Sequence, residues 1–159
     1  MQHVANLTEV RSRATGAAIE VEHLSHVYAG PDGGVPALVD ISMSVDVGRF
    51  VVIVGPSGCG KTSLLMMMAG LRRQTEGTIL CHGRPISDPD PQRVGVIFQE
   101  ASLFPWLTTL DNIEFPLSLR GTPREERHRR SQAMLTLVSL EGFGERYPHE
   151  LSGGMKQRV

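Results

Sequence analysis

Residues 55–62, which read GPSGCGKT, constrain this chain more than any other stretch. They follow residues 50–54, a continuously apolar and largely β-branched run that is typical of a strand buried on both faces of a parallel sheet. Residues 61–71 then read as a helix, and we expect the three adjacent methionines in it to fill gaps in the core. The sequence therefore predicts a strand, a glycine-rich turn and a helix in direct succession.

Three glycines, a cation and a hydroxyl directly after that cation are what a chain of phosphates requires. Backbone N–H groups must point inward on a tight curve, and a Cβ atom would obstruct both the curve and the approach. Lys61 can then reach the outer phosphates, Thr62 can ligate Mg²⁺, and the start of the helix adds its positive dipole end. We predict a phosphate cradle, with a glycine-rich turn that binds nothing as the alternative. The dinucleotide pattern G-x-G-x-x-G is not present at this position, which disfavours hydride chemistry.

The length, charge, cysteine content and apolar runs argue against several other classes of protein. The 159 residues suit one domain, and a net charge of −1 provides no overall basic field for nucleic acid. Cys59 and Cys81 suggest neither a disulfide framework nor a zinc site, which favours a reducing cytosol. No apolar run approaches the roughly 20 residues that span a bilayer, so we expect the chain not to insert into a membrane.

Residues 1–18 have no sustained periodicity, and we expect a flexible N-terminal tail. Residues 19–28 and 38–47 alternate partly and are separated by turn residues, which predicts two antiparallel strands. Residues 77–86 read as a short strand with a turn, and residues 94–99 read as another strand.

The last third of the sequence is helical in character. Thr122 to Glu125 form a capping-box pattern with Pro123 at the first helical position, so we expect a helix to begin there. Its charged first turns indicate a solvated face. An apolar stripe at helical spacing should pack against a neighbour: Ala133, Met134, Leu137, Val138 and Leu140. Ser152 can cap a further helix, and Val159 arrives without a stop signal, from which we expect a truncated sequence.

The cradle alone would suit a small-molecule kinase, a GTPase or a transport ATPase. The pentapeptide LSGGM at residues 151–155, after a strand ending in Gln99 and a mostly helical stretch, resembles the signature of ABC-transporter ATPase subunits. The resemblance runs from about Ile19 to the end. It implies an α/β P-loop NTPase fold of the ABC type with three parts, namely an antiparallel β subdomain, a RecA-like core and a helical subdomain at about residues 101–159, with the C-terminal part absent. Residues 19–159 would then be a partial ATP-binding domain.

The resemblance also implies roles for single residues. Tyr28 lies where the family has an aromatic residue that stacks on adenine, and Gln99 matches the glutamine that touches Mg²⁺ or the attacking water. Lys61 and Gln99 would be catalytic, and Thr62 and Gln99 would hold the metal. Signature residues would contact the γ-phosphate of ATP held by a second subunit in a head-to-tail dimer. The residues expected to bind ATP are Tyr28, Gly55, Pro56, Ser57, Gly58, Cys59, Gly60, Lys61, Thr62, Ser63, Ser152, Gly153 and Gly154.

The segment FQEASLFPWLTTLDNI, with LSGGMKQR, looks most like the ATPases of bacterial importers for nitrate, sulfonates or taurine. Such subunits sit peripherally on the cytoplasmic side of the inner membrane, contact transmembrane permease subunits, serve a solute-binding protein indirectly and bind no nucleic acid. We expect Trp106 and Phe104 to be buried, as is common for aromatic residues, with contact to that partner as the alternative.

The family's acidic strand motif and switch histidine are not in these residues, so we expect this chain alone to bind ATP without turning it over. One alternative is a short module that holds ATP without hydrolysis. Another is a soluble P-loop kinase for a small metabolite, which would leave LSGGM unexplained.

Overall fold

The computed structural model describes residues 16–30 and 33–159, and these residues form two compact units that divide after Val96. Most of the predicted tail lies outside the described residues. The first strand begins at Ala17, so the last two residues of the predicted tail belong to a strand.

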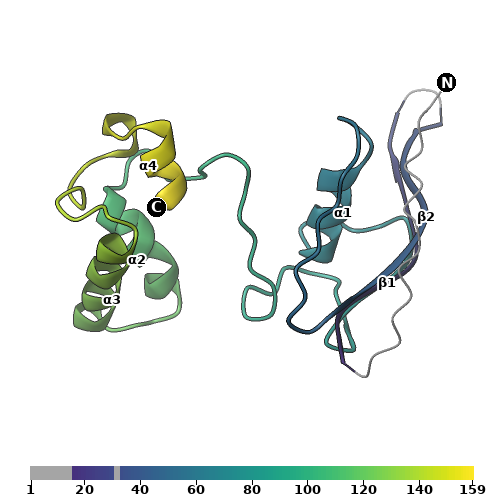
Figure 1. The fold of residues 1–159 in the computed structure, drawn as a ribbon, viewed down its shortest axis with the longest axis horizontal. Coiled ribbons are helices and arrows are strands. Elements are labelled where there is room, and N and C mark those ends of the chain that lie inside the picture. The colour runs from purple at the N-terminus through teal and green to yellow at the C-terminus, as the bar shows by residue number, and fades with distance from the viewer. Residues whose placement is uncertain (1–15, 31–32) are drawn as a thin grey trace. The chain divides into compact units, whose positions relative to one another are not determined.

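The first unit is built on a four-stranded antiparallel sheet (Figure 1). Its strands are β1 Ala17–Tyr28, β2 Val35–Asp46, β3 Glu76–Cys81 and β4 Arg84–Pro85, in the order β2-β1-β3-β4. β1 pairs with β2 on one side and with β3 on the other. The predicted antiparallel pair and the predicted strand with a turn are both confirmed.

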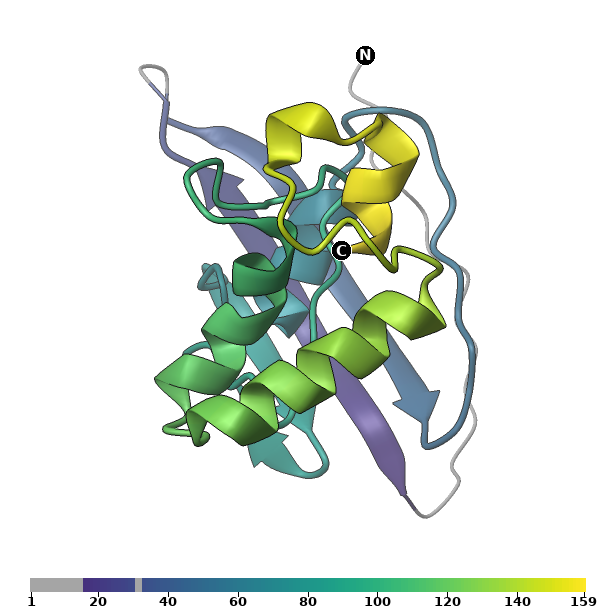
Figure 2. The same ribbon diagram turned by 90° about the vertical axis from the view of Figure 1, so that its left-hand side faces the viewer.

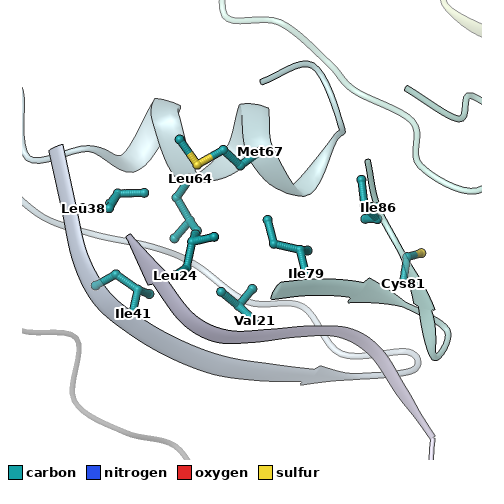
Figure 3. Close-up of a cluster of buried hydrophobic side chains, with 9 residues drawn as sticks. All are labelled: Val21, Leu24, Leu38, Ile41, Leu64, Met67, Ile79, Cys81 and Ile86. Carbon is teal, nitrogen blue, oxygen red and sulfur yellow. The ribbon is translucent and has the colours of Figure 1, made fainter. Parts of the chain in front are cut away.

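Helix α1, Lys61–Met68, packs its apolar side onto this sheet. Figure 3 shows Leu64 and Met67 directed at the side chains of the strands, and both are only 1% exposed. Met67 therefore has the predicted core role, and Met68 packs at the margin of the same cluster. The helix ends before the predicted residue 71, because Gly70 adopts a left-handed φ of 72°.

Two predicted strands do not form. Residues 50–54 and 94–99 are neither strand nor helix, and Phe50 and Ile97 are 92% and 96% exposed. Both predictions rested on apolar composition. A strand also requires a neighbour for its backbone N–H and C=O groups, and among the described residues neither segment belongs to a sheet.

The second unit, residues 97–159, is helical (Figure 2). It contains α2 Thr109–Leu119, α3 Arg124–Leu137, the 3₁₀ helix η1 Pro148–Glu150 and α4 Gly153–Arg158. Helices α2 and α3 lie side by side, and the core between them and the following loop consists of Leu110, Leu135 and Leu140. Within residues 16–30 and 33–159, no helix has the length and apolar character needed to cross a bilayer.

The predicted details of α3 are wrong in two respects. The N-cap is Pro123, without a side-chain hydrogen bond, because Thr122 belongs to the turn that closes α2 and its N–H donates to Leu117 O at 3.1 Å. The packing face is also rotated from the predicted stripe. Of the predicted stripe, Leu140 is buried and Val138 packs against the same core, whereas Met134 and Leu137 are 49% and 75% exposed. Within the helix itself, the buried residues are Ser131 and Leu135. The predicted solvation of the charged first turns is confirmed for most of them.

Candidate nucleotide-binding site

The glycine-rich turn is a tight loop that leads directly into α1. Gly58 and Gly60 have φ values of 80° and 97°, and Gly60 is the N-cap of the helix. A Cβ atom at Gly60 would lie 2.6 Å from Ala37 O and 2.8 Å from a methyl carbon of Leu38. Glycine is therefore required at this position by both the backbone conformation and the close approach of β2.

The first turn of α1 presents N–H groups that the helix does not use. The first intrahelical bond runs from Leu64 N–H to Gly60 O at 2.9 Å, so the N–H groups of residues 61–63 precede the ladder. The N-cap makes no side-chain hydrogen bond, and the first turn contains no acidic residue. These donors and the positive end of the helix dipole are arranged for an anion.

Lys61 folds back over the loop rather than extending into solvent. Its ammonium donates hydrogen bonds to the carbonyl oxygens of Gly55 at 2.9 Å and Pro56 at 2.7 Å, and it lies 3.6 Å from Cys59 Sγ. The loop thus holds a positive charge beside its own N–H groups, and the predicted contact of Lys61 with phosphates stays a prediction.

A cavity of about 250 Å³ joins this loop to the end of the sheet. It brings together six of the predicted residues, and its lining consists of Tyr28, Val35, Pro36, Ala37, Gly58, Gly60, Lys61, Thr62 and Ser63. The Tyr28 hydroxyl and Ser63 Oγ share a hydrogen bond of 2.7 Å. Thr62 lines the same cavity and carries a hydroxyl oxygen, the type of ligand that Mg²⁺ prefers. The residues present therefore fit a phosphate chain with its cation.

The surroundings of Tyr28 include two residues that sequence reasoning missed. The Arg72 guanidinium lies over the ring, 4.9 Å from its centroid, and the His26 imidazole meets it edge-on at 4.7 Å. Burial, and secondarily the charge of Arg72, lowers the pKa of His26 below its usual value. No motif marks these residues, although His26 could have been placed beside Tyr28 from the strand alternation.

Val35, Pro36 and Ala37 of the cavity wall were also not predicted. The register pairs Tyr28 with Val35, which carries the start of β2 to the cavity. Aligning the two strands across the turn would have indicated these residues.

The predicted residues Gly55, Pro56, Ser57 and Cys59 belong to the same loop but do not line the cavity. The other four predicted residues belong to the second unit. Gln99 is exposed at a bend, and Ser152 is the N-cap of α4, where its Oγ accepts a hydrogen bond from Met155 N–H at 3.3 Å. The predicted cap is confirmed. Gly153 and Gly154 form the exposed first turn of that helix. The roles of these four residues toward ATP stay predictions.

An anion cradle between an apolar segment and a helix, bordered by an aromatic ring, defines the class of P-loop nucleotide-binding proteins. The chain belongs to the ABC transporter family, whose sequence model matches residues 38–159.

Relatives and solved structures agree with that assignment. The chain is 46% identical over 141 residues to the nitrate import ATP-binding protein NrtD of Synechocystis sp., covering 89% of this chain and 53% of that protein. It is 46% identical over 143 residues to the taurine import ATP-binding protein TauB of Pseudomonas putida, covering 90% and 53%. The chain therefore spans about half the length of the curated relatives it matches.

The ATP-binding cassette MJ0796, solved as a dimer in a post-hydrolysis state with ADP and Pi, matches with a TM-score of 0.76 at 31% identity. The match covers 88% of this chain and 66% of that one. The predicted fold class, an α/β nucleotide-binding domain of the ABC type present in part, is confirmed.

Proposed function

We propose that this protein is the ATP-binding subunit of an ABC transporter that couples ATP binding and hydrolysis to solute import, of the nitrate, sulfonate or taurine type. The observation that carries the proposal is the cavity that joins Tyr28 to the phosphate cradle in a chain of this family. The names of NrtD and TauB as import ATP-binding proteins support the direction of transport and the solute class.

Each part of the cradle has a task in binding ATP. The free N–H groups at the start of α1 and the Lys61 ammonium bind the phosphates, and the Lys61 ammonium exchanges its carbonyl partners for phosphate oxygens. The Thr62 hydroxyl would hold Mg²⁺, and the ion would supply positive charge beside the phosphates. Gln99 orients the attacking water or touches the metal, which makes Lys61 and Gln99 the catalytic residues of this chain.

We further propose a head-to-tail dimer in which the exposed turn of Ser152, Gly153 and Gly154 contacts the γ-phosphate of ATP in the second subunit. The dimeric state of MJ0796 in its solved structure supports the formation of a dimer. The protein would act at the cytoplasmic side of the cell membrane on permease subunits, with a solute-binding protein as an indirect partner and without nucleic acid.

The second unit contains an exposed surface suited to the permease. Trp106 is 70% exposed and lies 5.4 Å from the Phe104 ring, which in turn lies 4.8 Å from Phe115. The Asn112 side chain fixes this loop, since it accepts from Phe104 N–H at 2.8 Å and donates to three carbonyl oxygens. A rigid loop with an exposed tryptophan favours the partner interpretation over burial.

Replacing Lys61 tests the nucleotide site, and the chain offers a matched control because its only other lysine is Lys156. We expect Lys61→Ala to abolish tight Mg-ATP binding, since Lys61 is the one cation among the described residues that line the cavity. Lys156→Ala should leave the affinity of the isolated subunit unchanged. Titration calorimetry measures both affinities. Equal ATP affinity in wild type and Lys61→Ala would refute the proposed cradle. A phosphate-release assay on the purified protein then separates a working ATPase from a module that only holds ATP.

A further inference from the structure

The Tyr28 ring is held on three sides by groups from different parts of the first unit. Its hydroxyl shares a hydrogen bond of 2.7 Å with Ser63 Oγ, at the start of α1. The His26 imidazole meets the ring at an interplanar angle of 84°, and the Arg72 guanidinium covers one face. A tyrosine at the end of a strand would otherwise rotate freely about its side-chain bonds, so this arrangement fixes an orientation.

Arg72 is brought to the ring by the turn that ends α1. Its backbone N–H donates to Met66 O at 3.2 Å, which closes the turn after the helix. The guanidinium carbon is 4.9 Å from the ring centroid, within the roughly 6 Å over which a cation is attracted to an aromatic face. The neighbouring Arg73 points elsewhere, since its guanidinium binds the Asp88 carboxylate at 3.1 Å. The two adjacent arginines therefore differ in what they contact.

His26 also holds the Tyr28 ring, from a buried position on the same strand. It is 8% exposed, and its Nδ1 lies 3.4 Å from Thr75 Oγ1, which also accepts a hydrogen bond from Val27 N–H at 3.1 Å. Its lowered pKa keeps the imidazole neutral near pH 7, so it does not repel the guanidinium above it. The Tyr28 ring thus contacts a neutral imidazole edge-on and a charged guanidinium on one face.

The cavity beside the cradle borders Tyr28 but is not lined by Arg72. The guanidinium therefore contacts the ring from outside the set of residues that line the cavity. Every nucleobase has a π-face that can stack on an aromatic side chain, and a nucleotide whose phosphates occupy the cradle has its base within reach of this tyrosine.

We propose that Arg72 is a positioning residue for base recognition, whose guanidinium holds the Tyr28 ring so that the ring's other face meets the base of the bound nucleoside triphosphate. The inference rests on the proposed ATP binding at the cradle. A ring that is already oriented loses less conformational freedom when the base stacks on it, so the contact raises affinity for the base without touching the phosphates.

The test compares a ligand that has a base with one that has only phosphates. Affinities for Mg-ATP and for inorganic Mg-tripolyphosphate are measured by calorimetry on the purified protein. We expect Arg72→Gln to weaken ATP binding about two- to fivefold, the range expected for an exposed cation–π contact, and to leave tripolyphosphate binding unchanged. Arg72→Lys should retain part of the ATP affinity, and Arg73→Gln, the matched control beside it, should retain all of it.

A double-variant cycle shows whether Arg72 acts through the ring. Tyr28→Leu should weaken the binding of ATP but not of tripolyphosphate. Adding Arg72→Gln to Tyr28→Leu should then lower the ATP affinity no further. The proposal is overturned if Arg72→Gln changes ATP and tripolyphosphate equally, leaves both unchanged, or tightens ATP binding, since tightening would mean that the guanidinium covers the face needed by the base. If the wild-type protein binds neither ligand, the proposed function itself fails.

Discussion

Residues 50–54 are richer in apolar and β-branched residues than strand β1, yet only β1 becomes part of a sheet. β1 has a hydrogen-bonded strand on each side, and Val21 within it is 2% exposed, whereas Phe50 is 92% exposed. The partner strand β2 follows β1 after a short turn, so closing that loop costs little entropy. Residues 50–54 pair with no strand among the described residues. The difference teaches that strand formation depends on an available neighbour as much as on composition.

Hydrogen exchange gives the largest expected contrast between these regions. Amides in the paired parts of β1 and β3 should exchange about a thousandfold or more slowly than free amides, because only extensive unfolding opens them. Amides of residues 51–54 and 95–98 should exchange at nearly the free rate. Mass spectrometry of peptic peptides measures both. Strong protection across residues 51–54 would show that another strand covers them and would remove the contrast.

Core truncation gives the next largest effect. Leu24 is fully buried in the sheet, and Val52 is 63% exposed. We expect Leu24→Ala to lower the free energy of unfolding by about 2–5 kcal/mol through lost burial and a residual cavity. Val52→Ala should change it by less than about 0.5 kcal/mol, as is usual for surface sites. Urea denaturation measures both values, and a similar cost at the two positions would contradict the described burial of the two regions.

The smallest expected effect is on the pH dependence of the free energy of unfolding, through His26 in strand β1. Because burial lowers the pKa of His26 in the folded protein, the unfolded chain binds more protons below about pH 6.5. The contribution of neutral His26 to stability is therefore present above that pH and is lost as the pH falls toward the folded-state value. We expect His26→Gln to flatten the decline in unfolding free energy between pH 7 and pH 5. The exposed His82→Gln serves as the control, and an equal slope in both variants would exclude His26 as the cause.

The candidate site was predicted from the sequence to the extent that it depends on local chain geometry. The glycines at positions 58 and 60, the cation at 61 and the following helix are adjacent in sequence, so their arrangement follows from backbone rules. The cap at Ser152 is local for the same reason. Arg72 escaped prediction because its contact with Tyr28 joins two points separated by β2, the cradle and α1.

By itself, the sequence determined the phosphate loop, the antiparallel pair of strands, the cap of α4 and the family. Each of these is specified within a short window by φ preferences, hydrogen-bonding side chains or adjacent strands, where little loop entropy opposes the pairing. Only the tertiary structure decided that residues 50–54 and 94–99 do not form strands, that α3 packs through Ser131 and Leu135, and that Arg72 covers Tyr28. Those outcomes depend on which distant groups are available as neighbours, and composition and periodicity do not contain that information.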